Sequence, residues 1–177
     1  FRSRRARIEM GQLALGNRLG AGAFGEVHAA SYNGTPVAVK RMHKQRGSVA
    51  SKVALSRAEA FRDEVLLLLE LRHPNIVQLI GGSWDVDSGD MCLVLELCQK
   101  GSLEGLLEDA HAYALCGWAT DFLPIALGVA RGMAYLHGQE PPIVHRDLRP
   151  ANVLLMSDLT PKIAAFAGAG PLQPAAS

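Results

Sequence analysis

The sequence predicts an α+β fold in which five strands, with one helix inserted after the third, precede a mainly helical part. Three observations predict it: β-rich runs joined by the turn dipeptide Asn33-Gly34, a helical apolar stripe over 56–71, and a second stripe from about Asp121 to Leu136. Because the strands do not alternate one-for-one with helices, a doubly wound parallel sheet is disfavoured.

The composition is that of an ordinary globular protein. The chain has 177 residues, of which 49% are hydrophobic and 20% charged, and 18 Lys and Arg against 17 Asp and Glu give a formal net charge of +1. This balance supplies no general electrostatic reason to bind nucleic acid. We therefore expect no nucleic-acid partner and, because no apolar run is long enough to cross a bilayer, no membrane span.

Cysteine usage bears on the compartment. The three cysteines, Cys92, Cys98 and Cys116, lack the paired spacing of zinc ligands or of a disulfide framework. Free thiols are typical of reducing compartments. The sequence therefore favours a cytoplasmic, intracellular location.

The first part of the chain predicts three strands. Residues 1–12, with four arginines among the first seven, are expected to be a basic leader or linker. From Leu13 a strand runs into glycines, and two further strands flank Asn33-Gly34, a strong hairpin signal. Residues 41–57 are polar and basic and predict a loop.

A helix and two further strands are predicted next. Apolar side chains of the 56–71 stripe recur at helical spacing, and His73-Pro74 ends the helix because the residue before proline is pushed out of helical geometry. Strands are predicted over 76–80 and 91–97, with the turn-rich residues 85–90 between them.

The rest of the chain predicts helices and then short strands. Ser102 is a candidate N-cap for a short helix, and Gly138 is placed to stop the longer one. From Ile143 we expect short strands and loops, and residues 171–177 are expected to be disordered. The apolar face expected for the longer helix contains Phe122, Ile125, Ala126, Val129, Met133 and Leu136.

A glycine-rich hairpin is the first candidate site. Gly20, Gly22, Gly25 and Val27 match the pattern G-x-G-x-x-G-x-V. A dinucleotide-binding fold requires a helix at the third glycine, whereas a strand follows here; a hairpin without a ligand remains an alternative. Glycines let the backbone approach phosphate oxygens, and Phe24 at the tip is placed to shield them from water.

Lys40 and Glu64 form a second candidate. Lys40 ends the apolar strand Val37–Val39, one hairpin away from the glycines, and Glu64 lies among apolar residues of the predicted helix. A buried carboxylate needs a partner, and Lys40 is the obvious one. The alternative is that both charges are solvated.

The string from Ile143 to Leu155 is the strongest candidate. It places Asp147 and Asn152 five residues apart between apolar runs. An aspartate there can accept a proton from an alcohol, and an asparagine can offer a neutral oxygen ligand to Mg²⁺.

Taken in order and spacing, these motifs resemble the eukaryotic protein kinases. The resemblance covers about residues 13–170 and includes the phrase H-P-N-I-V from His73 to Val77. Its wording is similar to the tyrosine-kinase-like group, Raf-like or mixed-lineage-like. It implies a bilobal fold with ATP held in the cleft between a β-rich lobe (13–98, including the hinge) and a partial, mainly helical lobe (99–170).

The resemblance also implies roles for single residues. Gly20, Gly22, Phe24 and Gly25 would cover the phosphates, and Lys40, paired with Glu64, would contact them. Asp147 would be the catalytic base, Arg149 would also belong to the catalytic residues together with Lys40 and Glu64, and Asn152 would bind Mg²⁺. The adenine would be held by Val27, Ala38 and Leu154, with Leu95 at the back pocket and Glu96 and Cys98 on its edge.

The chain departs from the family at three points. The D-F-G phrase reads Ala165-Phe166-Ala167, so that an alanine replaces the aspartate that chelates Mg²⁺. Arg149 replaces the lysine usual in serine/threonine kinases, although Pro150 fits them. Beyond Gly168 we expect a truncated lobe, which would expose the apolar face of the 121–137 helix.

Two functions follow as expectations. The first is a kinase domain that binds ATP and Mg²⁺ and, in a complete active form, transfers the γ-phosphoryl group to serine or threonine of a protein substrate. The alternative is a pseudokinase-like module that regulates a protein partner with little or no phosphotransfer.

Overall fold

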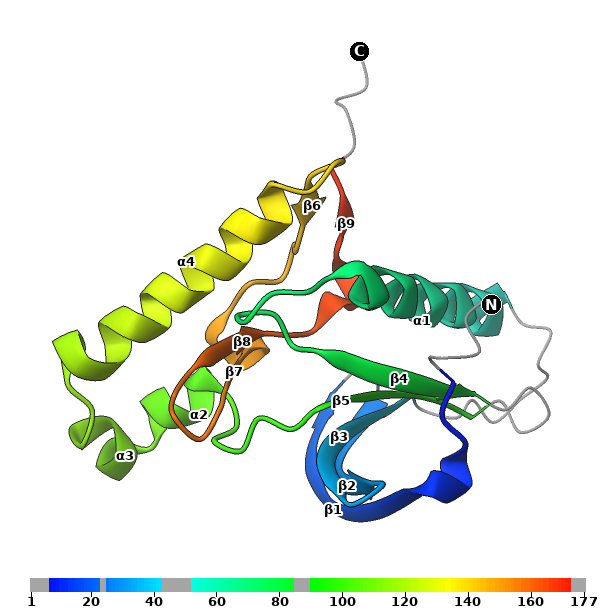
Figure 1. The fold of residues 1–177 in the computed structure, drawn as a ribbon, viewed down its shortest axis with the longest axis horizontal. Coiled ribbons are helices and arrows are strands. Elements are labelled where there is room, and N and C mark those ends of the chain that lie inside the picture. Colours follow the sequence, from blue (N-terminus) through cyan, green and yellow to red (C-terminus); the bar gives the residue numbers. More distant parts are fainter. Residues whose placement is uncertain (1–6, 23–24, 43–51, 85–89, 173–177) are drawn as a thin grey trace. The chain divides into compact units, whose positions relative to one another are not determined.

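The computed structural model describes residues 7–22, 25–42, 52–84 and 90–172. The chain folds as two compact units (Figure 1). The strand-rich unit contains Phe1–Leu69 and Gln78–Leu97, and the helical unit contains Glu70–Val77 and Cys98–Ser177.

One antiparallel sheet forms the strand-rich unit, in the order β1-β2-β3-β5-β4. Asn33 and Gly34 both have positive φ, 49° and 81°, as a two-residue Asn-Gly hairpin turn requires. The five strands with one helix after the third are therefore confirmed. The elements are β1 (Leu13–Gly22), β2 (Gly25–Tyr32), β3 (Thr35–Met42), α1 (Lys52–Glu70), β4 (Leu79–Trp84) and β5 (Met91–Glu96).

The predicted strand over 76–80 is displaced in the structure. β4 begins only at Leu79 and runs through Gly81 and Gly82, while Ile76 makes an isolated bridge with Ile163 in the helical unit. Glycine has a low propensity for strands, so the prediction ended the strand before Gly81 and placed it too early in the sequence. The predicted loop over 41–57 is shorter in the structure, because residues 41–42 belong to β3 and residues 52–57 belong to α1. Residues 43–51 of that loop and 85–89 of the predicted turn lie outside the described residues.

Residues 7–12 are packed onto the sheet, although the sequence suggested a solvated leader. Ile8 is only 3% exposed and joins a core cluster with Leu13 and Val39. Its amide donates to Gly82 O at 2.9 Å, and Met10–Gln12 form the short 3-10 helix η2. Burial of one isoleucine outweighs the arginine-rich composition around it.

The helix α1 buries one stripe of side chains, as predicted. Phe61, Val65 and Leu68 are buried, and Val65 Cγ2 lies 3.9 Å from the position that a Cβ on Gly82 would occupy. Leu66, on another face of the helix, is exposed.

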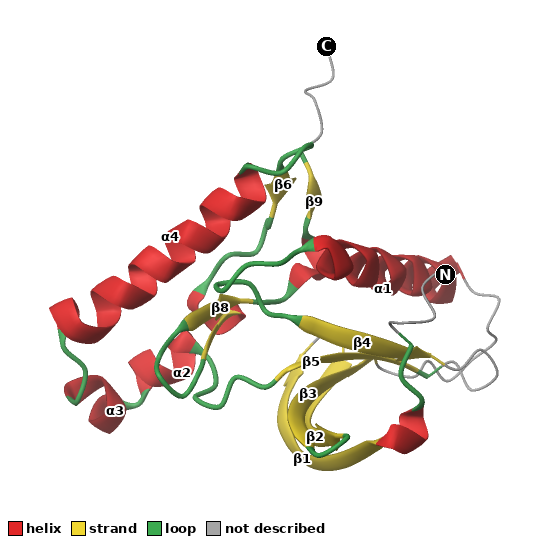
Figure 2. Cartoon of the chain, in the orientation of Figure 1, coloured by secondary structure: helices red, strands yellow, loops and turns green. Residues whose placement is uncertain are grey.

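Three helices dominate the helical unit (Figure 2). Ser102 caps α2 by accepting from Gly105 N, as predicted. The helix α3 was not predicted; Asp109 caps it by accepting from the amides of His111 and Ala112. The elements are α2 (Leu103–Glu108), α3 (Ala110–Ala114), the π-helical turn η3 (Trp118–Phe122), α4 (Leu123–His137), β6 (Ile143–Val144), the 3-10 turn η4 (Pro150–Asn152), β7 (Val153–Leu155), β8 (Pro161–Ile163), the 3-10 turn η5 (Phe166–Gly168) and β9 (Gly170–Pro171).

The helix α4 buries a glycine stripe. Ile125, Gly128, Gly132 and Leu136 are buried, and a Cβ on Gly128 would collide with the Pro161 ring. The sequence prediction omitted both glycines because it counted only apolar side chains.

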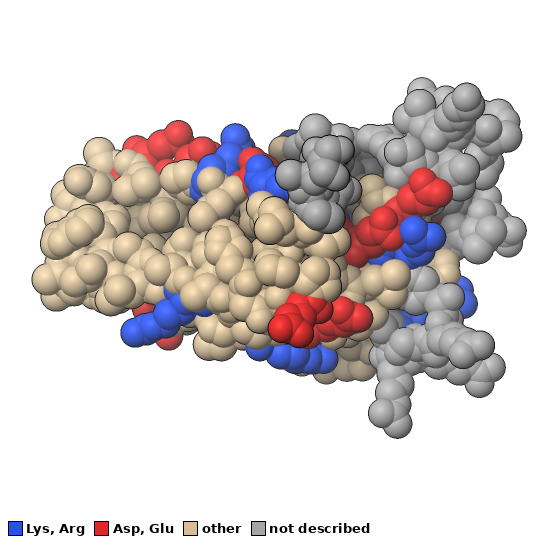
Figure 3. Space-filling view, turned by 90° about the horizontal axis from the view of Figure 1, so that it is seen from above, with Lys and Arg blue, Asp and Glu red and all other residues tan. Residues whose placement is uncertain are grey.

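The exposed side of α4 carries large apolar side chains as well as the charged Arg131. Leu123 and Leu127 are exposed, and the end of the molecule that carries the start of α4 is mostly tan in Figure 3. The prediction that the face with Ile125 and Leu136 would be exposed is wrong, because β8 and Asn75 cover that face. Ala126, assigned to the same face, is exposed.

The segment Glu70–Val77 ties α4 to β8. Asn75 Nδ2 donates to Pro161 O at 3.0 Å, and the Ile163 amide donates to Asn75 O at 2.9 Å. The His73 ring stacks on Tyr135 with centroids 5.0 Å apart and accepts from the Asn75 amide at 3.0 Å through Nδ1. The segment Glu70–Val77 therefore positions β8, the strand that leads directly into Ala165-Phe166-Ala167.

The first two residues of the predicted tail, Pro171 and Leu172, are ordered in the structure. Gly170–Pro171 pairs with β6, and the Leu172 amide donates to Pro142 O at 2.8 Å. The free edge of β6 accepts these residues despite their small, proline-rich composition. Residues 173–177 lie outside the described part of the chain.

None of the helices in the described part of the chain has the length and apolar character needed to cross a membrane.

Gly128→Ala should destabilise the chain by about 1–3 kcal/mol in urea unfolding, because the added methyl overpacks against Pro161 and Asn75. Gly105→Ala is the matched control. Its Cβ would meet only Ser102 Oγ at 3.6 Å, so helix propensity should stabilise that variant by up to about 1 kcal/mol. Equal stabilisation by both changes would contradict the packing described for Gly128.

Stability should fall as the pH drops below about 6.5, the ordinary pKa of histidine. Burial, aided by the Lys162 charge, lowers the pKa of His73. The stability linked to neutral His73 is therefore complete above that pH and is lost as the pH falls through the lowered folded-state pKa. His73→Asn keeps an acceptor for the Asn75 amide but cannot titrate, so its urea midpoint should vary less between pH 7.5 and 5.5. An unchanged pH dependence would exclude His73 as the source.

Candidate functional site

The glycine hairpin is built where β1 and β2 meet. Gly22 pairs with Gly25, and a Cβ on Gly25, whose φ is +155°, would collide with Arg41 O. Gly25 is therefore required by its backbone and its neighbour strand. Gly20 has open space where a Cβ would lie. Phe24 lies outside the described residues.

One face of the sheet gathers five predicted site residues. Cross-strand partners project from the same face, and so do alternate residues of one strand. Val27 is the partner of both Gly20 and Lys40, and Ala38 is the partner of Leu95. The register therefore places Gly20, Val27, Ala38, Lys40 and Leu95 on a common face, opposite to the face of the Ile8 cluster.

The Lys40 ammonium and the Glu64 carboxylate form a buried ion pair. Lys40 Nζ donates to Glu64 Oε1 at 2.8 Å and to Oε2 at 2.9 Å. The Lys40 side chain is 15% exposed and that of Glu64 only 3%. Of the two interpretations the sequence left open, the paired one is confirmed.

Glu96 lies at the end of β5. Its amide donates to Gln78 O at 3.0 Å, and its Oε1 accepts from the Gln78 amide at 2.8 Å. Cys98, which begins the second segment of the helical unit, is buried, and its carbonyl accepts from the Gly101 amide at 3.4 Å.

In the helical unit, His145 organises the strongest sequence motif. It is fully buried, its Nε2 bonds to Ala164 O at 2.8 Å, and its Nδ1 accepts from the Asp147 amide at 3.3 Å. These bonds assign the proton to Nε2 and make the ring neutral. Phe166 packs edge-on against the ring with centroids 5.0 Å apart.

The Asn152 amide group holds the Asp147 loop closed. Its Nδ2 donates to Asp147 O at 2.7 Å and to Asp147 Oδ2 at 2.8 Å. The Ala164 amide donates to Asn152 O at 2.9 Å. Asp147 is exposed, so its carboxylate is held in place while remaining open to solvent.

Ala165 adopts a left-handed conformation, with φ 65° and ψ 60°. This conformation costs an L-residue about 1–2 kcal/mol, and aspartate and asparagine tolerate it better than alanine. The backbone thus has the conformation that an aspartate suits, but the side chain is a methyl group.

The remaining predicted residues lie nearby in the helical unit. Arg149 is exposed at the start of η4. Leu154 in β7 pairs with Lys162 and makes a bridge with Ser102. Arg146, which the sequence did not single out, donates to Gly168 O and Pro171 O, both at 3.3 Å. Its side chain therefore ties the Asp147 loop to the chain after η5.

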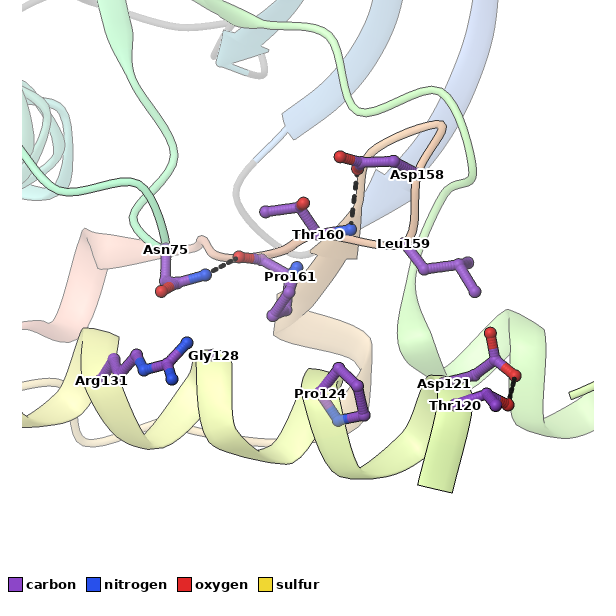
Figure 4. A pocket seen from close by; sticks show the side chains of 10 residues that line it. All are labelled: Asn75, Thr120, Asp121, Pro124, Gly128, Arg131, Asp158, Leu159, Thr160 and Pro161. Carbon is purple, nitrogen blue, oxygen red and sulfur yellow. Dashed lines mark hydrogen bonds between the residues drawn. The ribbon is translucent and has the colours of Figure 1, made fainter. Parts of the chain in front are cut away.

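A pocket of about 230 Å³ lies within the helical unit, and none of the residues that line it is a predicted site residue (Figure 4). Hydrogen bonds from the Thr120 hydroxyl and the Gly117 amide lower the pKa of Asp121, and bonds from Thr160 lower the pKa of Asp158. Both carboxylates are therefore ionised at neutral pH. The residues that line this pocket are scattered in the sequence and form no motif, so sequence analysis did not find it. They are Asn75, Thr120, Asp121, Pro124, Gly128, Arg131, Asp158, Leu159, Thr160 and Pro161.

Comparisons with known proteins agree with this arrangement of motifs. A family model described as protein tyrosine and serine/threonine kinase matches residues 13–173. Dual specificity protein kinase splA of Dictyostelium discoideum is 37% identical over 155 residues, 88% of this chain and 6% of its own. Putative cysteine-rich receptor-like protein kinase 16 of Arabidopsis thaliana is 41% identical over 152 residues, 85% of this chain and 21% of its own.

Serine/threonine-protein kinase VIK of Arabidopsis thaliana is 38% identical over 152 residues, which is 85% of this chain and 32% of its own. The chain thus spans a third or less of the length of these relatives.

Lys40→Met should destabilise the strand-rich unit by about 3–5 kcal/mol in urea unfolding, because it leaves the Glu64 carboxylate buried without its cation. The double variant K40M/E64M removes both charges and should recover most of that loss. A double variant no more stable than K40M would contradict the buried pair.

Arg41→Met is the control on the same strand. Arg41 forms a more exposed pair with Asp90, with Nη2 and Oδ1 3.9 Å apart. Its removal should cost at most about 1 kcal/mol.

Proposed function

Because the chain belongs to the protein tyrosine and serine/threonine kinase family, we propose that it binds ATP and transfers its γ-phosphoryl group slowly or not at all. The proposal places it in the serine/threonine, tyrosine-kinase-like group, similar to Raf or mixed-lineage kinases. It follows that a protein substrate or a regulatory protein is the partner, and that the site of action is cytoplasmic.

The buried pair between Lys40 and Glu64 is the observation that carries the proposal. An ammonium held by both carboxylate oxygens has a fixed position, and one proton of the three remains to donate elsewhere. In the family this lysine contacts the α- and β-phosphates. Retention of so costly a buried pair, in a unit that apolar side chains alone could pack, supports a role in nucleotide binding.

Other residues of the proposed nucleotide site follow the same family positions. The glycine hairpin, with Phe24, covers the phosphates, and Arg149 supplies a further positive charge. The adenine is held by Val27, Ala38 and Leu154, Leu95 borders the back pocket, and the backbone of Glu96 and Cys98 bonds the adenine edge.

Asp147 is the proposed base. Its carboxylate is open to solvent, its backbone amide is anchored on His145, and one of its oxygens accepts from Asn152. A substrate hydroxyl positioned beside the other carboxylate oxygen of Asp147 would donate its proton to that oxygen while the hydroxyl oxygen attacks phosphorus. Pro150 favours a serine or threonine hydroxyl, whereas Arg149 offers a guanidinium where the serine/threonine class has an ammonium.

The residues of the proposed site suit the triphosphate of ATP better than they suit Mg²⁺. The Lys40 ammonium and the glycine hairpin suit a triphosphate. Mg²⁺ prefers oxygen ligands that include one or two carboxylates, and the family's second protein ligand is here Ala165. The residues present therefore do not fit the metal, and its usual contribution to phosphoryl transfer is lost.

A pseudokinase-like regulatory module is the second candidate, and Ala165 with Ala167 favours it. In this role the nucleotide-bound shape of the domain, rather than turnover, would act on a partner. Loss of about 4 kcal/mol of transition-state stabilisation corresponds to roughly a thousandfold loss of rate. Such a rate would separate this chain from active kinases.

ATP should stabilise the chain. A ligand at about 100 times its Kd adds about 2.7 kcal/mol to folding, or some 5–10 °C in Tm for a chain of this size. Thermal shift measured with increasing ATP tests it, with inorganic triphosphate as the control for phosphate contacts alone. Absence of any shift with ATP would overturn the nucleotide-binding proposal.

Transfer of label from γ-labelled ATP to a generic protein substrate should be about a thousandfold below ordinary kinase rates of roughly 1–100 s⁻¹. Asp147→Asn is the control that separates activity of this chain from a contaminant. Turnover at ordinary kinase rates that D147N abolishes would contradict the proposal that this chain transfers the γ-phosphoryl group slowly or not at all.

A further inference from the structure

We infer that this chain binds nucleotide without requiring a divalent cation. The inference rests on the proposed nucleotide binding and goes further, because it assigns the metal dependence of that binding to one side chain. It follows from what the helical unit offers, and does not offer, as oxygen ligands around Asn152.

The ligands left at this position are few and partly occupied. Asn152 offers only its neutral Oδ1, because Nδ2 donates to Asp147 O and Oδ2. The Asp147 carboxylate already accepts one of these bonds. A small, hard cation that dehydrates reluctantly gains little from one amide oxygen and one carboxylate shared with a hydrogen-bond donor.

The other aspartates of the helical unit, among the residues that the structure describes, accept local hydrogen bonds of their own. Asp158 accepts from the Thr160 amide at 2.9 Å within the turn between β7 and β8. Asp121 accepts from the Gly117 amide at 2.8 Å, and Asp109 caps α3. Within the described ranges no three His, Cys, Asp or Glu side chains cluster in a way that could hold a metal ion.

The backbone, in contrast, is still arranged for a ligand at position 165. The Ala164 amide donates to Asn152 O, and Ala164 O accepts from His145 Nε2. These two bonds fix the chain beside Asn152 immediately before Ala165. Ala165 itself holds the left-handed conformation that aspartate and asparagine accept. A carboxylate restored there would therefore project from an already ordered backbone.

We expect one substitution to make ATP binding depend on Mg²⁺. For the unaltered chain, the Kd for ATP in excess EDTA and in excess Mg²⁺ should agree within about threefold, by equilibrium dialysis with labelled ATP. For Ala165→Asp, Mg²⁺ should tighten binding by tenfold or more, equivalent to about 1.4 kcal/mol.

Ala167→Asp is the matched control, because it adds the same charge two residues away, inside η5. It should leave binding indifferent to Mg²⁺, as should Ala165→Leu. Thermal unfolding of each variant without nucleotide establishes that it is folded. If A165D fails to fold, Ala165→Asn, which also accepts the left-handed backbone, replaces it, and Mg²⁺ should then tighten binding by more than the threefold allowed for the unaltered chain.

The outcomes separate the inference from its premise. No binding in either buffer overturns the proposed function itself. Binding by the unaltered chain that Mg²⁺ tightens tenfold leaves the proposed function standing and overturns the inference. An equal gain in A165D and A167D also overturns it, because added negative charge, not a ligand at position 165, would then attract the metal.

Discussion

A carboxylate can be buried only with a partner, and this constraint specifies how α1 lies on the sheet. Apolar packing through Phe61, Val65 and Leu68 alone would tolerate a small rotation or slide of the helix. The Glu64 carboxylate does not, because any other register would leave it, or Lys40, buried and unpaired. Since Lys40 is fixed in turn by its strand partners Val27 and Leu93, the ion pair couples helix, sheet and glycine hairpin.

The helical unit meets a similar requirement with backbone groups and a neutral histidine. His145 is buried with both ring nitrogens bonded, one to Ala164 O and the other to the Asp147 amide. Asn152 then closes the loop through Asp147. None of these bonds uses the side chain of residue 165, so the loop keeps its geometry whichever residue stands there. Ala167, within η5, is likewise accommodated without disturbing the buried Phe166.

Local signals in the sequence predicted much of the fold. The β-rich runs and the Asn33-Gly34 turn predicted the hairpins, Ser102 predicted the cap of α2, and the need to neutralise Glu64 predicted its pairing with Lys40. These succeed because each depends on neighbours in sequence or on a single electrostatic requirement.

What the sequence could not predict depends on tertiary contacts of residues with weak local signals. Ile8 is buried because a strand far along the chain offers it a backbone partner, Gly82 O. β4 passes through Gly81 and Gly82, which propensity disfavours, because β5 pairs with it. Gly128 and Gly132 pack α4 against β8 through the absence of a side chain, which no count of apolar residues detects. The pocket in Figure 4 is lined by segments that meet only in three dimensions.

Binding and phosphoryl transfer make different demands on these residues, and the chain meets them unequally. Holding a nucleotide needs a shaped surface, backbone donors and a positive charge, all of which the strand-rich unit can supply through the glycine hairpin and Lys40. Transfer also needs compensation of the charge that develops on the phosphoryl oxygens. A methyl group at position 165 removes part of that compensation while the bonds of His145 and Asn152 preserve the loop. Because none of these bonds uses the side chain at position 165, the proposed loss of turnover leaves intact the fold that carries the proposed nucleotide site.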